Sequence, residues 1–289
     1  MHHTTTTKTA LARELGVARS SLYYRPIRPH NDEEFKQQLL TVTNEHPAYG
    51  HKRIAMALGW NKKKALRLMK AFHIRPLLQR KRPVKPGDQG NLPTNVPNIA
   101  KTLCPIQPHA LWVGDFTYLP WHGNTFIYVA TVLDVYTREI LGWHIGTHHS
   151  TDLVIAAFLD ACERTGKTPK IFHSDQGSEY VSGDYEQLPQ DLHVMISHSK
   201  KSSPWENGYQ ESFYNNFKLE LGNPRQYTEL GELTEKIHRQ LHYYNTRRIH
   251  TSIKMPPQTF RLLTERNHVA AVATTFPSTP LLISSPMSV

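Results

Sequence analysis

The chain contains few cysteines, and this scarcity limits its chemistry. Only Cys104 and Cys162 occur among its 289 residues. Two isolated thiols provide neither a disulfide framework nor a thiolate zinc site, and they suit a reducing cytoplasm. The 18 histidines are scattered and lack the paired spacing of zinc ligands. We therefore look for the chemistry of the chain among its oxygen-bearing side chains.

Long apolar runs are also missing. No segment approaches the roughly 20 apolar residues that a membrane-spanning helix needs, and residues 1–8 lack the apolar core of a secretory signal. Hydrophobic residues make up 38% of the chain and aromatic residues 10%, as is typical of globular proteins. The composition predicts a globular protein without a membrane partner, long enough for two domains.

Acidic residues are scarce in the first third of the chain. Residues 1–100 hold 18 Lys or Arg against 6 Asp or Glu, whereas residues 101–289 hold 16 against 18. The net charge of +10 therefore arises in the first third. A solvated basic surface is the simplest alternative, but charge concentrated in one region is typical of a nucleic-acid partner.

Two helical hairpins lie in this basic region. In residues 9–24, Gly16 permits a turn between two short helices, which is a helix-turn-helix pattern. Residues 33–74 continue with an amphipathic helix, a break at 46–50 and two further helices, with Tyr49 expected to pack inside. DNA contacts are expected from Arg19, Ser20, Tyr23, Lys52, Arg53, Lys62, Lys63, Lys64 and Arg67.

Composition and pattern together predict the domain boundaries. Seven prolines between residues 75 and 108 exclude regular helices, so this stretch reads as a basic linker that either follows DNA or acts as an inert spacer. The end of the chain is rich in Thr, Ser and Pro and is expected to be poorly ordered. The predicted regions are 1–28 and 29–75 (helix-turn-helix), 76–108 (linker), 109–262 (catalytic core) and 263–289 (tail).

The region after the linker has an α/β pattern. Runs of β-branched and aromatic residues predict strands, and a turn at 121–124 predicts a hairpin between the first two. Thr151 or Asp152 is expected to cap the helix that follows the third strand. The expected strands are 112–118, 126–134, 139–145 and 170–174, and the expected helices are 151–163 and 208–221.

Three acidic residues stand where these elements would bring them together. Asp115 ends an apolar, strand-like run, and Asp175 follows a second such run. Glu211 lies in a predicted helix, with 35 residues between it and Asp175. Such carboxylates form a cage that suits Mg²⁺ or Mn²⁺. Asp134 also ends a strand, but we expect it to make a turn hydrogen bond. Lys218 would share the helix face of Glu211 and hold a phosphate.

The segments around these acids resemble the three catalytic blocks of the DDE transposases of bacterial insertion sequences, of the second-reading-frame type. The resemblance covers roughly residues 8–262 and includes a segment similar to the Tyr-Gly-aromatic-Arg-Arg motif, with His51 and Lys52 as departures. Residues 206 and 208 also depart from the commonest form. The matching segments are 112–117, 173–178, 206–213, 217–220 and 244–250.

This resemblance implies both a fold and an activity. The expected fold is a ribonuclease-H-like, integrase-like catalytic core behind an all-α helix-turn-helix region. The expected activity is cutting of transposon-end DNA and joining of its 3′-OH to target DNA, with Asp115 and Asp175 sharing one metal ion and Asp115 and Glu211 a second. Partners would be double-stranded DNA with terminal inverted repeats, target DNA, further copies of the chain and a first-frame product, in the bacterial cytoplasm at the nucleoid.

Several alternatives stay open at this point. A transposase-derived DNA-binding protein that no longer cuts would not need the acidic triad, and a ribonuclease-H-type nuclease without strand transfer would not need the basic helical region. A stand-alone transcription factor would not need an α/β core. The side chains of Tyr244, Asn245, Arg248 and His250 either brace the core or contact DNA, and Arg248 and His250 are taken as DNA contacts.

Overall fold

The computed structural model divides the chain into two compact units, Met1–Pro76 and Leu77–Val289. Each unit has buried apolar side chains of its own. Within the described residues, no helix is both long and apolar enough to cross a bilayer. The structure describes residues 7–23, 28–77, 96–175, 192–200 and 204–275.

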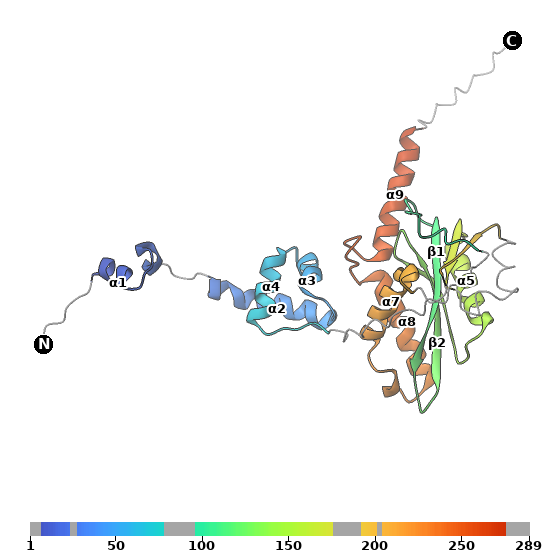
Figure 1. The fold of residues 1–289 in the computed structure, drawn as a ribbon, viewed down its shortest axis with the longest axis horizontal. Coiled ribbons are helices and arrows are strands. Elements are labelled where there is room, and N and C mark those ends of the chain that lie inside the picture. Colours follow the sequence, from blue (N-terminus) through green and yellow to red (C-terminus); the bar gives the residue numbers. More distant parts are fainter. Residues whose placement is uncertain (1–6, 24–27, 78–95, 176–191, 201–203, 276–289) are drawn as a thin grey trace, which may run out of the picture. The chain divides into compact units, whose positions relative to one another are not determined.

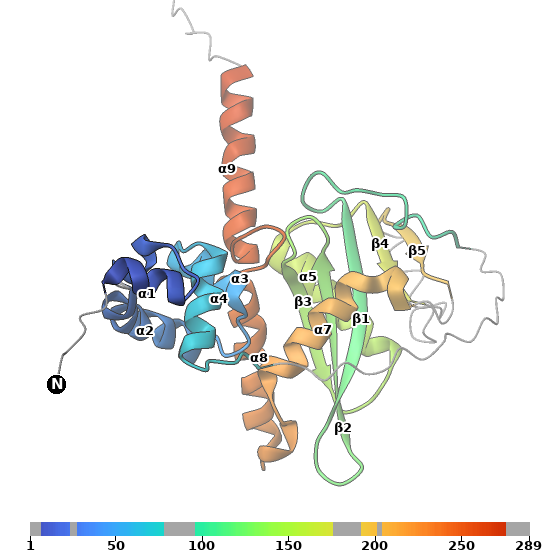
Figure 2. The ribbon, with the colours of Figure 1, turned by 60° about the vertical axis from the view of Figure 1, so that its left-hand side comes forward.

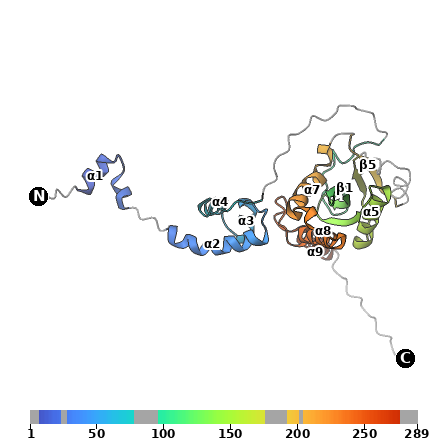
Figure 3. The ribbon, with the colours of Figure 1, turned by 90° about the horizontal axis from the view of Figure 1, so that it is seen from below.

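The first unit consists of helices, and its last two form a helix-turn-helix (Figure 3). Gly59 closes α3 in the left-handed conformation, with φ at 64°, and the Asn61 side chain caps α4 by accepting a hydrogen bond from the Lys63 N–H at 2.8 Å. Tyr49 is fully buried, as predicted. The helices are α1 (Lys8–Glu14), the 3-10 helix η1 (Arg19–Tyr23), α2 (Arg28–Glu45), α3 (His51–Leu58) and α4 (Lys62–Ala71).

Two helices of this unit differ from the prediction. The second helix of the first hairpin is the 3-10 helix η1, because it buries no residue and its serines favour local turns over a long α-helix. Helix α2 begins at Arg28, earlier than expected, because Pro29 lies in its first turn, where a missing N–H breaks no hydrogen bond.

The second unit is built on a five-stranded mixed sheet in the order β3-β2-β1-β4-β5. Strand β1 lies at its centre, antiparallel to β2 and parallel to β4. The chain first forms the antiparallel hairpin β1–β2 and later crosses through a helix to the parallel strand β4 (Figure 2). This mixed sheet confirms the predicted ribonuclease-H-like α/β arrangement. The strands are β1 (Leu111–Pro120), β2 (Phe126–Asp134), β3 (Ile140–Gly146), β4 (Ile171–Ser174) and β5 (Met195–His198).

Helices cover both faces of this sheet (Figure 1). On one face α5 (Thr151–Thr165) packs against Trp112 and Phe172. Gly142 of β3 allows this close approach, because a Cβ there would collide with the backbone of α5. On the other face, α7 and α8 bury an apolar layer against β1 and β2. The remaining elements are η2 (Pro204–Asn207), α7 (Gly208–Leu221), η3 (Pro224–Gln226), α8 (Leu230–Thr246) and α9 (Pro257–Thr275).

Three expectations about this unit need correction. Ser150 caps α5, accepting a hydrogen bond from the Leu153 N–H at 3.4 Å, whereas the prediction placed the cap one or two residues later. The expected tail from residue 263 begins inside helix α9, whose Leu- and Ala-rich segment favours helix (Figure 1). The end of the linker docks on the sheet, because Ser197 Oγ accepts hydrogen bonds from Ile99 and Ala100. Residues 79–82, which contribute three basic side chains to the predicted linker, lie outside the described residues.

Candidate active site

Strand pairing sets the two aspartates side by side. Asp115 lies on central strand β1, and Asp175 follows β4 directly. The parallel register pairs Val113 with His173, so continuing it by two residues sets Asp115 beside Asp175. Taken as whole residues, both aspartates are half-buried. The rest of the second motif, from residue 176, lies outside the described residues.

Glu211 lies in the first turn of α7, which two polar side chains attach to the sheet. The Gln210 amide is fully buried and donates to the Val113 carbonyl at 2.7 Å and to the Thr131 carbonyl at 3.1 Å. One turn later, the Tyr214 hydroxyl donates to the Asp115 carbonyl at 2.6 Å. These bonds hold the start of α7 over the strand segment that carries Asp115 (Figure 2).

Electrostatic coupling shows that the three acids share one environment. Burial, together with the charges of Asp175 and Glu211, raises the pKa of Asp115 to about 8. The Phe116 N–H, which donates to Asp115, and the ammonium of Lys218 act in the opposite direction on this pKa. The acids and Lys218 therefore lie within electrostatic reach of one another.

Neighbouring carboxylates repel one another, and a divalent cation that binds their hard oxygen atoms relieves this repulsion. Among the described residues, no three acidic, His or Cys side chains are grouped closely enough to hold a metal ion. The triad is thus coupled but not gathered around one point. The all-carboxylate donor set and the raised pKa of Asp115 fit Mg²⁺ or Mn²⁺.

Asp134 has the structural role that was expected. Its carboxylate is buried and accepts backbone hydrogen bonds from Tyr136 and Thr137, both at 2.8 Å, and from His109 at 2.7 Å. Those bonds shape the turn after β2. Asp134 is therefore committed to the fold and separate from the triad.

Buried histidines lie directly behind Asp175. His173 Nδ1 is 2.9 Å from Ser197 Oγ, and in the next register position Ser174 Oγ is 3.0 Å from His198 Nδ1. Burial lowers the pKa of His173 to about 4, so the imidazole is neutral. This reciprocal pairing between β4 and β5 fixes the strand end that carries Asp175.

The predicted DNA contacts of the first unit differ in how their side chains are placed. Lys64 lies over the rings of Phe35, at 3.2 Å from the centroid, and Trp60, at 4.4 Å. The Arg67 guanidinium makes two hydrogen bonds to Asp32, at 2.5 and 2.7 Å. Arg53 lies over the Tyr49 ring, whereas the other predicted contacts are exposed: Arg19, Ser20, Tyr23, Lys52, Lys62 and Lys63.

Arg248 is a correction to the predicted DNA contacts. Its side chain is fully buried, donating to Glu220 at 2.7 Å and to Asn216 at 2.8 Å. It therefore ties the end of α8 to α7, where no phosphate can reach it. Tyr244 also braces the core, donating to the Arg138 carbonyl, while His250 forms a bridge with Met255.

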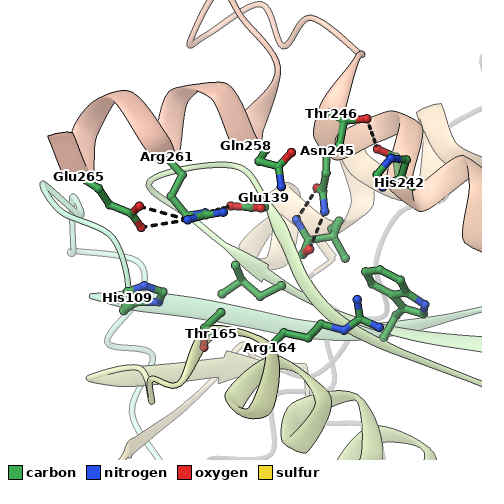
Figure 4. Close-up of a pocket in the computed structure, with 13 residues that line it drawn as sticks. His109, Glu139, Arg164, Thr165, His242, Asn245, Thr246, Gln258, Arg261 and Glu265 are labelled. Carbon is green, nitrogen blue, oxygen red and sulfur yellow. Dashed lines mark hydrogen bonds and ion pairs between the residues drawn. The ribbon is translucent and has the colours of Figure 1, made fainter.

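A cavity of about 280 Å³ opens at the outer edge of β3 (Figure 4). Three of its charged groups are paired with one another: Arg261 donates to Glu139 at 2.6 Å and to Glu265 at 3.0 Å. The Asn245 amide exchanges two hydrogen bonds with the Ile140 backbone, as a neighbouring strand would. The three acids of the triad do not line this cavity, which is distinct from the candidate active site.

Comparison with known proteins agrees with the geometry. Two family profiles, each described as an integrase core domain, match residues 105–204 and 192–257, together slightly more than half of the chain. Residues 105–257 therefore match the integrase core. The predicted relationship to DDE transposases of insertion sequences is also confirmed, because named transposases are among the relatives of this integrase core protein.

Two relatives and one solved structure illustrate the match. The transposase for IS904 of Lactococcus lactis is 36% identical over 148 residues, covering 50% of this chain and 58% of that protein. A 31 kDa protein of insertion element IS600 of Shigella sonnei is 28% identical over 261 residues, which cover 85% of this chain and 95% of that protein. A solved structure of the HTLV-2 integrase catalytic core domain in complex with magnesium is 16% identical. The match covers 54% of this chain and 98% of that chain, with a TM-score of 0.41. This integrase core chain thus spans just over half the length of the IS904 relative.

Sequence reasoning missed Gln210 and Tyr214. The available signal was two polar residues one turn apart among the apolar Phe213 and Phe217, all on the buried side of α7. A polar residue on an apolar helix face needs a buried partner. Here the partners are the carbonyls around Asp115.

We expect Tyr214→Phe to slow DNA cleavage about ten-fold and to lower stability by about 1 kcal/mol, because the Asp115 carbonyl loses its donor and the strand under the triad relaxes. Burial raises the pKa of Tyr214 well above its usual range, so the hydroxyl remains a donor throughout the working range. Tyr244→Phe is the matched control, since it also deletes a buried hydroxyl bonded to a carbonyl. Equal loss of cleavage in both variants would contradict a specific role for Tyr214.

Proposed function

We propose that the chain is a DNA transposase that cuts transposon-end DNA and joins the released 3′-OH to target DNA. The observation that carries this proposal is the parallel register that sets Asp115 of β1 beside Asp175, with α7, which carries Glu211, bonded to the Asp115 carbonyl through Tyr214. Carboxylates placed in this way bind divalent cations rather than acting as nucleophiles. The integrase core of the relatives supports the same reaction class.

Each side chain of the site has a distinct task in this proposal. Asp115 would contribute to both cation positions, with Asp175 completing one and Glu211 the other. A pair of Mg²⁺ or Mn²⁺ ions would supply Lewis acidity at the attacking and leaving oxygens. Lys218, two turns along α7 from Glu211, would hold a DNA phosphate beside the carboxylates. Gln210 and Tyr214 keep the helix in register with the strand.

The first unit would recognise the ends of the element. Its exposed lysines at the start of α4 and Lys52 of α3 fit phosphate contacts, while the paired Arg67 and the ring-bound Lys64 contribute to the fold of the unit. Two ends must be cut in one transposition event, so copies of the chain would assemble on DNA, with or without a first-frame product, at the bacterial nucleoid.

The test is an assay with purified full chain, Mg²⁺ and labelled duplex DNA that carries the inverted repeats flanking its gene. Wild type should nick at the repeat ends and join them, whereas Glu211→Gln should bind the DNA without cutting. Binding with no metal-dependent cleavage, even after the first-frame product is added, would replace the proposal with a non-cutting DNA-binding protein. Cleavage without joining would indicate a nuclease.

Cation binding should depend strongly on pH. Because the pKa of Asp115 is about 8, a cation must displace a proton in neutral solution and binds more tightly as pH rises. We expect Mg²⁺ to raise the melting temperature more at about pH 8.5 than at about pH 6, at constant ionic strength. The same rise at both pH values would contradict this, and Asp115→Asn serves as the control.

A further inference from the structure

Two aromatic rings are exposed on the β1–β2 hairpin. Tyr118 of β1 is 54% exposed and Phe126 of β2 is 38% exposed. Their rings meet edge to face, with centroids 5.5 Å apart and planes at 89°. The apolar surface of these rings is exposed to water, which is unfavourable, and a binding partner that covered them would remove this free-energy cost.

Lys218 connects this aromatic pair to the triad. Its ammonium lies 5.0 Å from the centroid of the Tyr118 ring and also lowers the pKa of Asp115. The side chain comes from α7, two turns beyond Glu211. One lysine therefore lies between an exposed ring and the catalytic carboxylates.

On the basis of the proposed function, we propose that Tyr118, with Phe126 beside it, stacks an unpaired nucleobase of the DNA strand next to the phosphodiester being cut. Lys218 would hold the phosphate of that nucleotide. A base inside a duplex already stacks on its neighbours, so an exposed ring gains area only from a base that has left its pair. The DNA end would then be opened at the site.

Size and charge favour a nucleotide over a protein partner. Two rings form a far smaller surface than the roughly 800 Å² per partner of a stable protein interface. The cation beside the ring complements a phosphate, and ring plus cation is the combination that binds single-stranded nucleic acid. A second copy of the chain would bury more apolar area than these two side chains provide.

The first experiment compares cleavage of a fully paired repeat end with cleavage of an end whose pairs next to the cut are mismatched. We expect Tyr118→Ala to cut the paired end about ten-fold more slowly and the mismatched end at nearly the wild-type rate. Tyr118→Trp should behave like wild type on both. Leu159→Ala, which removes an exposed apolar side chain from α5 on the other face, is the control. An unchanged rate on the paired end, or equal losses on both ends, would overturn the inference.

A second measurement does not depend on cleavage. A 2-aminopurine placed beside the cut position, with Ca²⁺ in place of Mg²⁺, should change its fluorescence on binding to wild type. In Tyr118→Ala the change should fall by at least half. A Tyr118-dependent change without any cleavage by wild type would reject the proposed function and retain the stacking surface. The same change in both proteins would reject the stacking surface alone.

Discussion

We expect Asp115→Asn to reduce DNA cleavage by at least about 1,000-fold, because the carboxylate that we propose for both cation positions is lost. We also expect the variant to be more stable than wild type when divalent cations are absent. The reason is the repulsion within the triad, since the neighbouring charges and burial raise the pKa of Asp115 to about 8. An amide at this position keeps the size of the side chain and removes the repulsion.

The direction of the pH dependence follows from that raised pKa. A folded-state pKa above the unfolded value means that folding favours the protonated carboxyl. Stability from this group is complete below about pH 4 and is lost as pH rises through about 8. Above that range Asp115→Asn should gain roughly 1–3 kcal/mol over wild type, less than the full shift implies because solvent reaches the site. At about pH 4 the two proteins should unfold alike.

Thermal unfolding in a chelator across pH, paired with the cleavage assay, measures both effects. Asp134→Asn is the matched control, because the same change at the end of β2 weakens a carboxylate that accepts three backbone hydrogen bonds. It should destabilise the protein at neutral pH. Destabilisation by Asp115→Asn at pH 9 would show that the acids do not repel one another in the folded chain.

Arg248→Leu should destabilise the protein by about 3–5 kcal/mol, the cost of leaving a buried charge without its partner. The side chains of Arg248 and Glu220 are only 1% and 8% exposed, and their atoms are 2.7 Å apart. The Gln240 amide also donates to Glu220, so one carboxylate joins α7 to α8. Loss of the arginine would loosen the helix that carries Glu211.

Chemical denaturation and DNA binding at several salt concentrations together distinguish bracing from DNA contact. A bracing arginine lowers the free energy of unfolding and leaves the salt dependence of binding unchanged, whereas a phosphate contact reduces the salt slope by about one. Arg248→Leu combined with Glu220→Leu should recover much of the stability, since no buried charge then lacks a partner. Unchanged stability in Arg248→Leu would contradict the buried pair.

The sequence by itself determined most strands of the sheet and the helices α5 and α7, and it predicted the three acids as the site. Alternating and continuous apolar runs predicted β1, β2 and β4 within a few residues, and the spacing of Asp115, Asp175 and Glu211 indicated the candidate site. These signals are local or carried by motifs. Local signals also had limits, since the predicted cap of α5 and the predicted start of α2 differ by a few residues from the observed positions.

Only the tertiary structure decided which polar side chains serve the fold. A sequence cannot show that Arg248 points into the core toward Glu220, or that Gln210 and Tyr214 reach carbonyls on β1, because these partners lie 28 to 99 residues away. The same holds for Lys64, whose ammonium lies over the ring of Phe35. The sequence specifies the charge and polarity of each side chain, but the burial of that side chain and its hydrogen-bond partners depend on packing between distant segments.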